Sequence, residues 1–466
     1  MKKTIFVLGL LAAAVSANIL ITTYGCTSPG PGSSQGGDTI SNKYAVLPTD
    51  INEQKQAAAD LFSWQTFIAM NWPADVRNCG PDTTNGTTIL SGKGPVVWES
   101  YLTSDQVFVN SPAHPAPWCM NGGLAENTSI AHLPLKVQEL ARKTGIYRFV
   151  HRISKTPHGL EEAVGGPLVD QNGRFVRYEV RMNHDEYNYI MAYSLWDTTG
   201  QHKFPDSTVV MPAGATKYGP VGAMEFKAAW KVLGAGDDTN RFYKIKAIVY
   251  NDDSNDPSPG PNPVTLGLVG LHIAHKTANQ RNWVWSTFEQ VDNLTKSFYN
   301  PKCDTCKPNQ PVPGSKYVEL DSNGKPLNAP TQVTRVNPID DPAADSLNKY
   351  FQSLLKGSVW ANYQLVSTQW LFFENMAPSF LANSVQETYV QGPKPPTFGN
   401  FQPIIDQPYY KDTAYHPFAP GISASCMGCH YVATFPYNQG VRTDFSFIFT
   451  EVKVGSGKQV LGVKKK

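Results

Sequence analysis

The segment VTLGLVGLHIA, residues 264–274, decides the fold. Apolar side chains occupy both its odd and its even positions, whereas a strand with one solvated face alternates apolar and polar residues. We therefore predict a central strand that is buried on both faces of a sheet. The aromatic segment from Trp283 to Phe288 follows closely, and we expect it to pair beside that strand.

Three earlier segments predict the rest of this sheet, because each alternates apolar residues with polar ones. They are residues 176–182, 224–230 and 243–249. In the second of them, the alternation predicts that Glu225 and Lys227 face outward. Antiparallel pairing is the more common arrangement of such strands, so we expect a mainly antiparallel sheet.

Helical spacing of apolar residues occurs on both sides of these strands. It extends from Asp50 to Met70, where Asp50 and Glu53 resemble a capping box. A second helix is predicted from Asp341, before a proline, to Gly357, and a third from Trp360 to Trp370. The predicted class is α+β, with a mainly antiparallel β-sheet body and helices near the N-terminus and in the C-terminal part.

The N-terminus is typical of an export signal. Two lysines at positions 2–3 precede an apolar run from Ile5 to Ile21, as in a secretory signal peptide. Residues 15–17, Val-Ser-Ala, are one candidate cleavage site for ordinary signal peptidase. Residues 23–26, Thr-Tyr-Gly-Cys, resemble a bacterial lipobox with Cys26 as the lipid anchor, although Leu usually stands first in that motif. An uncleaved anchor is the third alternative.

The chain divides into four predicted parts. Residues 1–25 are the signal peptide, 26–46 a flexible linker, 47–340 the β-rich body, and 341–466 a helical part packed on that body. Its 40 Lys and Arg against 38 Asp and Glu give a net charge of +2. This balance argues against nucleic-acid binding, which needs a concentrated basic surface.

The sequence Cys426-Met427-Gly428-Cys429-His430 carries the chemistry of the chain. Its spacing is that of c-type haem attachment, in which two thiols bond to the porphyrin and the adjacent His binds iron. We therefore predict one covalent haem c, held by Cys426 and Cys429, with His430 as the proximal iron ligand. A disulfide beside an ordinary His is the alternative. Attachment of such a haem takes place outside the bacterial cytoplasm, in agreement with the export signal.

The distal iron ligand has to come from the chain before the motif, because neither Met nor His follows His430. His272, near the end of the predicted buried strand, is the first candidate. Alternation along that strand predicts that it shares an apolar face with Leu266 and Leu268. His275 is three residues further on and is expected to face the other side.

Two residues nearer the motif are weaker candidates. Met376 follows an aromatic-rich segment, where packing is the common role of a methionine. His416 lies ten residues before Cys426 and is expected near the haem edge, where it would bond a propionate. An iron with no distal protein ligand, open to water and substrate, is the remaining alternative.

Four of the seven cysteines are left after Cys26 and the motif are set aside. An even number of cysteines in an exported chain predicts disulfides, and four cysteines allow three pairings. We favour Cys79 with Cys119 and Cys303 with Cys306, because the second pair lies in one short loop flanked by prolines. A thioredoxin-like or zinc-binding role for that loop lacks the strand–helix setting or the further ligands it needs.

Several blocks of the chain resemble exported bacterial proteins described as cytochrome c family proteins, which are large and carry one C-terminal haem motif. The blocks are Ser63–Phe67, Asn71–Pro73, Val97–Ser100, Glu225–Trp230, Gly270–Ile273, Trp285–Glu289, Asn362–Leu365, Thr368–Trp370, Glu387–Tyr389 and Ser425–His430. They cover most of the mature chain. The resemblance implies a haem c at the motif and a single integrated architecture, and it names no substrate.

Three functions are compatible with one haem in a chain of this size. The first is electron transfer outside the cytoplasm, with a redox partner protein, by a periplasmic or outer-membrane-attached lipoprotein anchored at Cys26. The second is a haem enzyme of the peroxidase or oxygenase type, acting on a small-molecule substrate at an open iron. The third is a redox or gas sensor. The length of 466 residues exceeds what an electron carrier needs and favours the second somewhat.

Overall fold

The computed structural model describes most of the chain from residue 39 to residue 453. The described residues are 39–53, 55–84, 86–92, 94–109, 113–119, 130, 133–150, 167–216, 219–250, 262–280, 282–310, 329–336, 338–339, 342–370, 382–391, 426, 430 and 433–453. All of them except Thr39 belong to one compact unit, Ile40–Lys466. None of the helices formed by these residues has the length and apolar character needed to cross a bilayer.

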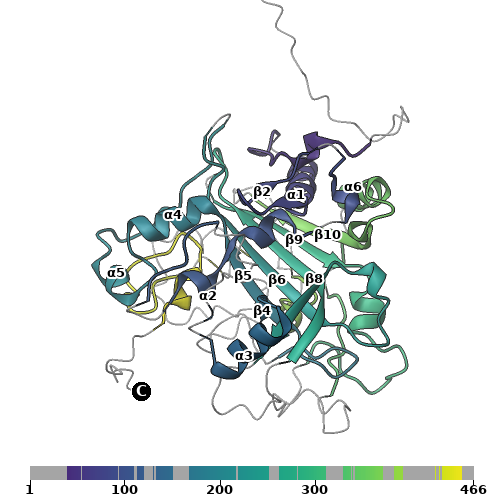
Figure 1. Ribbon diagram of the computed structural model, residues 1–466. Coiled ribbons are helices and arrows are strands. Elements are labelled where there is room, and N and C mark those ends of the chain that lie inside the picture. The colour runs from purple at the N-terminus through teal and green to yellow at the C-terminus, as the bar shows by residue number, and fades with distance from the viewer. Residues whose placement is uncertain are drawn as a thin grey trace, which may run out of the picture. The chain divides into compact units, whose positions relative to one another are not determined.

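The central feature is an eight-stranded sheet in which the predicted buried strand is β8 (Asn262–His275) (Figure 1). The strand order is β10-β9-β8-β6-β5-β3, with β7 paired to β8 and β4 to β7. Among these strands only β4 and β7 pair parallel. The other strands are β3 (Leu102–Thr103), β4 (Phe149–Val150), β5 (Arg177–Met182), β6 (Met224–Val232), β7 (Lys244–Val249), β9 (Val284–Gln290) and β10 (Tyr363–Gln369). The predicted α+β class and mainly antiparallel sheet are confirmed.

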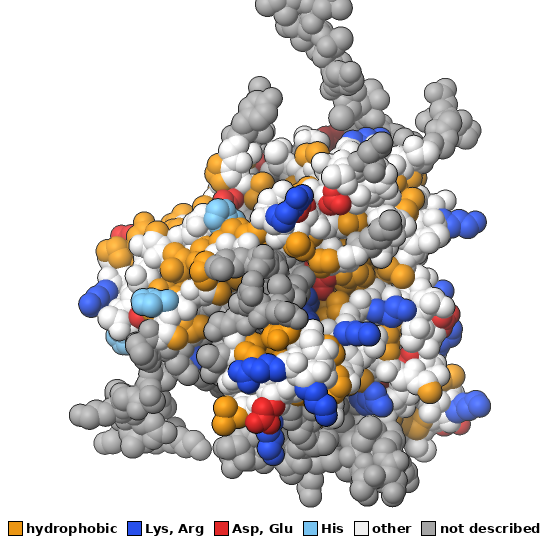
Figure 2. Space-filling view, in the orientation of Figure 1, with side chains coloured by type: hydrophobic (Ala, Val, Ile, Leu, Met, Phe, Trp, Pro, Cys, Tyr) orange, Lys and Arg blue, Asp and Glu red, His pale blue; other side chains and the backbone are white. Residues whose placement is uncertain are grey.

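Helices and short elements surround the sheet. The α-helices are α1 (Gln56–Met70), α2 (Ser104–Val107), α3 (Leu135–Thr144), α4 (His184–Ala192), α5 (Thr198–Lys203) and α6 (Pro342–Leu354). A small hairpin is formed by β1 (Ala74–Asp75) and β2 (Gly80–Pro81). The single turns are η1 (Asn42–Ala45), η2 (Ile89–Ser91), η3 (Val97–Ser100), η5 (Thr239–Arg241), η6 (Asn293–Ser297), η7 (Val359–Asn362), η8 (Thr388–Val390) and η10 (Ile448–Glu451). Figure 2 shows hydrophobic side chains over α4 and α5, where Tyr193 and Val210 are exposed.

The first face of the sheet is covered by α1 and α6. Trp64 of α1 stacks on Phe351 of α6 at 5.0 Å between ring centroids, and Phe67 stacks on Phe288 of β9 at 4.2 Å. The hydroxyl of Ser63 also bonds to Ser286 of β9. These contacts bury the apolar side of α1 in the main core, and burial of this kind is the dominant favourable term in folding.

The start of α1 differs from the prediction. The helix begins at Gln56, six residues after Asp50, and its N-cap Lys55 makes no side-chain cap hydrogen bond. The Asp50 carboxylate accepts hydrogen bonds from a loop after β8 instead, at Thr277, Asn279 and Gln280. A tertiary contact therefore uses the carboxylate that a local cap would have used, while the predicted end at Met70 is confirmed.

The predicted helix from Trp360 to Trp370 is wrong. Only the turn η7 is helical there, and residues 363–369 form β10, which pairs antiparallel with β9. The unpaired edge of β9 accounts for this, because pairing with it satisfies the backbone groups of the segment and buries Tyr363 and Leu365. The strand lies within the predicted helical part 341–466, so that part contributes to the same sheet as the body.

The prediction that Glu225 faces outward is also wrong, because its side chain is buried on the second face, opposite α1. Every residue of β5 is buried as well, including Arg177, Glu179 and Arg181. Those three charged side chains lie on the first face, since they pair with Trp230, Ala228 and Phe226 of β6. Period-two alternation correctly separated the residues of each strand into two faces. On this sheet, however, the charged residues of β5 and Glu225 of β6 are buried as well as the apolar ones.

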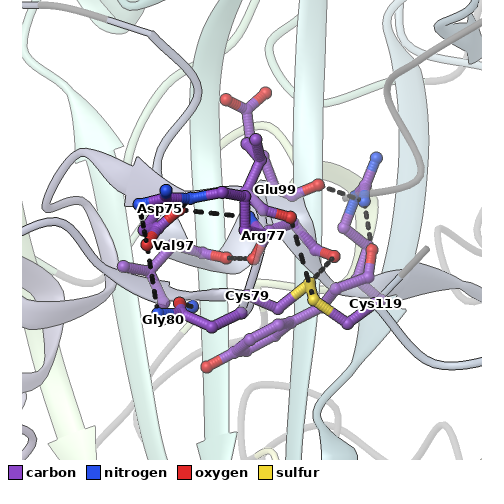
Figure 3. The surroundings of a disulfide bond; sticks show 12 residues. Asp75, Arg77, Cys79, Gly80, Val97, Glu99 and Cys119 are labelled. Atoms are coloured by element: carbon purple, nitrogen blue, oxygen red, sulfur yellow. Dashed lines mark hydrogen bonds and ion pairs between the residues drawn. A yellow bond between two sulfur atoms is a disulfide. The ribbon is translucent and has the colours of Figure 1, made fainter. Parts of the chain in front are cut away.

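Two disulfides confirm the favoured cysteine pairing, Cys79–Cys119 and Cys303–Cys306. The first lies beside η3 (Figure 3), where the Sγ of Cys79 is 3.3 Å from the carbonyl oxygen of Ser100. It joins residues 40 apart in sequence. The second closes an exposed loop three residues long.

Replacing Cys79 and Cys119 with alanine is expected to lower the free energy of unfolding by up to about 4 kcal/mol, on the chain-entropy model for a loop of this length. The matched variant, Cys303→Ala with Cys306→Ala, opens a much smaller loop and is expected to lose about 2 kcal/mol or less. Denaturant unfolding of the two double variants measures both losses of unfolding free energy. Equal losses would show that loop length does not govern the contribution.

Candidate functional site

The haem motif is described at two of its residues. Cys426 and His430 both have helical backbone conformation and are half-buried. The Cys426 side chain packs at the margin of an apolar cluster formed by β5, β9 and the C-terminal segment. The buried members of that cluster include Val180, Met182, Trp285, Phe435, Val441, Ile448 and Phe449. Cys429 lies outside the described residues, so its predicted role stays a prediction.

The His430 ring is held on two sides. Its Nδ1 hydrogen bonds to the backbone carbonyl oxygen of Phe445 at 2.7 Å. The ring lies 4.5 Å from the ring of Trp285 in β9 and 5.0 Å from that of Phe447, measured between centroids. A carbonyl can only accept, so Nδ1 carries the proton and the lone pair lies on Nε2. This is the usual arrangement of a histidine whose Nε2 binds a metal.

The turn that supplies this carbonyl has an uncommon backbone. Asp444 and Phe445 have φ values of 48° and 67°, in the left-handed region that non-glycine residues seldom adopt. Lys276, just after β8, donates to both carboxylate oxygens of Asp444 at 2.9 Å, and the N–H of Met211 donates to Oδ2 at 2.9 Å. Backbone strain of this kind persists where surrounding contacts fix it, commonly at functional sites.

The His430 ring lies against the second face of the sheet, where it contacts Trp285. The side chains of this face stand in rows across the strands, because directly paired residues of antiparallel strands point to the same face. The row that includes the His430 contact is Trp285, Ala274, Glu225 and Met182. The next row, about 7 Å along the strands, is Thr287, His272, Lys227 and Val180. The sheet thus brings His272 and His430 to neighbouring rows of one face.

The expectation that His272 shares a face with Leu266 and Leu268 is wrong. Trp230 pairs with Leu268 and Ala228 with Leu271, so the register shifts by one residue between them. This bulge reverses the alternation, and His272 lies on the second face while both leucines lie on the first. Gly270 lies at this bulge. An added Cβ there would lie 2.8 Å from a side-chain carbon of Val385, which is too close for a larger residue to fit without a shift.

Both ring nitrogens of His272 have partners on that face. Nε2 lies 3.1 Å from each carboxylate oxygen of Glu387, and Nδ1 hydrogen bonds to the hydroxyl of Thr287. Its role as distal ligand stays a prediction, and iron binding would require one of these hydrogen bonds to break. Met376 and His416, the other candidates, lie outside the described residues, as does Cys26.

His275 lies on the face opposite to His272, as predicted, but this is the first face, which it shares with Leu266 and Leu268. Its ring stacks on Phe62 of α1 at 5.8 Å between centroids, and its Nε2 hydrogen bonds to the carbonyl oxygen of Val221 at 2.7 Å. Burial lowers its pKa to about 4, against the weaker opposing effect of that carbonyl. It is therefore a neutral core histidine at neutral pH.

Sequence reasoning missed the residues that position His430. Trp285 was placed on a predicted strand, but no pattern in the sequence showed which ring it would contact. Asp444 and Phe445 carry little signal, because Asp is enriched in left-handed backbone but Phe is not, and the pair does not predict such a turn. Within the described parts of the chain no group of three or more His, Cys, Asp and Glu side chains is arranged to hold a metal ion.

Comparison with known proteins adds no relative: no family model, no curated protein and no solved structure matches the chain. The functional argument therefore rests on the motif and on the surroundings of His430. Those surroundings fit a haem ligand in two respects. The orientation of the ring leaves the Nε2 lone pair available to a metal, and an apolar cluster lies beside Cys426.

Proposed function

We propose that this chain is an exported c-type haem protein that transfers electrons outside the cytoplasm. The observation that carries the proposal is the hydrogen bond from His430 Nδ1 to Phe445, in a residue that closes a Cys-x-x-Cys-His motif. A histidine fixed in this way is oriented and tautomerically set to bind iron through Nε2. The haem itself would supply the one-electron Fe(III)/Fe(II) couple.

The residues of the chain have separate roles in this proposal. Cys426 and Cys429 would hold the haem covalently, and His430 would bind its iron. Trp285 and Phe447 contact the His430 ring and hold it in place. The ion pair of Lys276 with Asp444 fixes the turn that presents the Phe445 carbonyl. A rigid ligand sphere of this kind suits electron transfer, because it limits rearrangement when the iron changes charge.

A haem enzyme is the second candidate, and one observation favours it. His272, hydrogen bonded to the carboxylate of Glu387, lies in the row next to that of Trp285, whose ring contacts His430. A histidine paired with a carboxylate is a common general acid–base group. If the iron has no distal protein ligand, this pair would be placed to exchange protons with a bound substrate.

Export is part of the same proposal. It is supported by the N-terminal signal pattern and by two disulfides, which persist in oxidising compartments. Lipid anchoring at Cys26 is proposed on the lipobox-like sequence alone. Radiolabelled palmitate incorporated into the wild-type chain and lost in Cys26→Ala would support the anchor, and no incorporation would leave a soluble exported form or an uncleaved signal anchor.

An optical spectrum of protein matured in a periplasm that attaches c-type haem tests the proposal. We expect a covalent haem whose reduced form is six-coordinate, low-spin and unchanged by carbon monoxide. A high-spin spectrum that shifts with carbon monoxide would favour the enzyme. The absence of covalent haem would overturn both. In a low-spin protein, His272→Gln distinguishes the distal ligand, since it would convert the iron to high spin only if His272 binds it.

A further inference from the structure

We propose that the Cys303–Cys306 disulfide is a thiol–disulfide exchange site that accepts two electrons from a dithiol of another exported protein. This role goes beyond the proposed haem function and does not depend on it. It also differs from that of a thioredoxin-like motif, because the two cysteines lie in turns between Pro301 and Pro308 and not at a strand–helix junction.

The disulfide is accessible from solvent. Cys306 is exposed and Cys303 is half-buried, and the residues between and beside them are exposed. Exchange begins when a thiolate reaches one of the two sulfurs, so access is one of the factors that set its rate. We therefore expect an incoming thiolate to attack Cys306, with Cys303 as the leaving sulfur.

The loop does not depend on this bond for its position, because both of its ends are tied to residues 332–334. The Gln332 side chain accepts from the N–H of Asn300 at 3.0 Å and donates to its carbonyl oxygen at 3.0 Å. The backbone carbonyl of Gln332 accepts from the N–H of Asn309 at 2.7 Å. The Asn309 side chain also exchanges two hydrogen bonds of 2.9 Å with the backbone of Thr334. Reduction of the disulfide is therefore expected to leave the loop in place.

The two disulfides of the chain differ in what they can contribute to stability. Cys79–Cys119 joins residues 40 apart and Cys79 is buried, whereas Cys303–Cys306 joins residues only three apart. The entropic stabilisation by a disulfide grows with the length of the closed loop. Exposed disulfides are in general the labile, regulatory or catalytic ones. The first bond thus has a structural role (Figure 3), and the second is available for chemistry.

The charges and the hydroxyl beside the disulfide favour exchange. Lys302 and Lys307 flank the cysteines and Asp304 lies between them, so the loop carries a local charge of +1. Positive charge attracts an incoming thiolate and stabilises the thiolate that leaves. The Thr305 hydroxyl lies 4.0 Å from the Sγ of Cys303. A disulfide sulfur has no proton to give, so the hydroxyl is the donor, and it would continue to donate to a Cys303 thiolate.

The exchange is balanced in two steps. A thiolate of the partner attacks the Sγ of Cys306, the bond between Cys303 and Cys306 breaks, and Cys303 leaves as a thiolate that takes a proton from solvent. The second thiol of the partner, after losing its proton, then attacks its own sulfur in the mixed disulfide and releases Cys306 as a thiol. The partner loses two electrons and two protons and gains a disulfide, while Cys303 and Cys306 become a dithiol.

Reduction of the folded full-length chain tests the lability of the site. Free thiols are first blocked with N-ethylmaleimide, dithiothreitol is added without denaturant, and the thiols that it releases are labelled with deuterated N-ethylmaleimide and located by mass spectrometry. We expect label at Cys303 and Cys306 at least about 100-fold faster than at Cys79 and Cys119, with an unchanged circular dichroism spectrum. Equal rates for the two disulfides, or release only on unfolding, would overturn the proposal.

Electron acceptance is tested with a reduced synthetic peptide that contains Cys-x-x-Cys, mixed anaerobically with one equivalent of the blocked protein. We expect the peptide to be oxidised and two new thiols to form at Cys303 and Cys306. Cys303→Ser with Cys306→Ser should leave the peptide reduced. A peptide that also stays reduced with the wild type would overturn the proposal.

The flanking charge provides a readout that a purely structural bond would not give. Lys302→Gln with Lys307→Gln is expected to slow oxidation of an uncharged peptide by about threefold at low salt, and the difference should disappear at high salt. Lys203→Gln with Lys356→Gln removes two exposed lysines at α5 and after α6 and is the matched control. Equal slowing in the two variants would overturn the role of the loop charge. The blocking step removes Cys426 and Cys429 as reactive thiols if haem is absent, so failure of the haem proposal and failure of this one are distinguishable.

Discussion

Replacing Glu179 with alanine is expected to lower the free energy of unfolding by about 3–5 kcal/mol, because it removes the paired carboxylate of the buried Arg181 and leaves the buried Arg148 with Glu99 as its remaining counter-charge. Arg148 Nη2 lies 2.6 Å from Glu179 Oε2, and Arg181 Nη2 lies 2.7 Å from Oε1. The indole N–H of Trp230 also donates to Oε2 at 3.2 Å. Every member of this group is buried, so water cannot replace the lost carboxylate.

The network connects three segments that are far apart in sequence. Arg148 precedes β4 and also pairs with Glu99 of η3 at 3.0 Å, while Arg181 of β5 donates to backbone carbonyls of residues 99 and 101. Tyr243, just before β7, hydrogen bonds to Glu99. Removing Glu179 therefore weakens the attachment of η3 to the sheet, where the Cys79–Cys119 disulfide also lies (Figure 3).

Glu53→Ala is the matched control for Glu179→Ala. Glu53 pairs with Lys55 at 2.9 Å, but both side chains are exposed, and such pairs contribute about 0–1 kcal/mol. Denaturant unfolding at neutral pH measures both variants. A loss below 1 kcal/mol for Glu179→Ala would show that the buried network does not fix the fold as described here.

The pH dependence of the same site has a defined sign. Burial alone would raise the pKa of Glu179, but the charges of Arg148 and Arg181 and their hydrogen bonds outweigh it and lower the pKa. A lowered folded-state pKa contributes stability that is present above the ordinary value of 4.5 and is lost as pH falls through the folded pKa. Glu179→Gln should therefore flatten the acid limb of the stability curve.

Much of the sheet could be predicted from the sequence, and the errors have local causes. Residues 264–274 predicted the central strand because their composition is apolar on both faces. The same pattern misplaced His272, since alternation is counted residue by residue and one bulged position reverses every later assignment. A bulge depends on how two strands pair, which a single strand does not encode.

Charge was a poor guide to exposure in this chain. Glu225 was expected to follow the rule that charged residues of an alternating strand face water, but it is buried, as is Arg181 of β5. Each is buried beside other charged or polar groups that come from distant segments. Such pairing is a property of the fold, so it could not be predicted from residue types within one strand.

For the candidate site, the sequence predicts only the residues of the Cys-x-x-Cys-His motif, and their haem attachment stays a prediction. The spacing of Cys426, Cys429 and His430 predicts haem attachment because that chemistry is local to five residues. The groups around it come from elsewhere: Trp285 from β9, and Lys276, which pairs with Asp444, from the residue after β8. Long-range pairing places them together, and the sequence predicted only the strand on which Trp285 lies.

Replacing Cys426 and Cys429 with alanine is expected to abolish covalent haem completely while the chain still folds. Both thioether bonds are lost, and any haem held by His430 alone should be removed by acid and organic solvent. Folding should persist because Cys426 lies at the margin of its apolar cluster, half-buried. Haem staining of the denatured protein, with circular dichroism of the native protein, measures the two effects separately.

The chain supplies a matched control for that variant. Cys303→Ala with Cys306→Ala removes two cysteines at the same spacing, but Lys307 stands where the motif has its histidine. We expect this variant to retain covalent haem in full and to lose only its small loop disulfide. Equal haem content in the two variants would mean that the 426–430 motif is not the attachment site. Haem lost from the first variant alone would establish that Cys426 and Cys429 are the attachment site, next to His430 and its Trp285 contact.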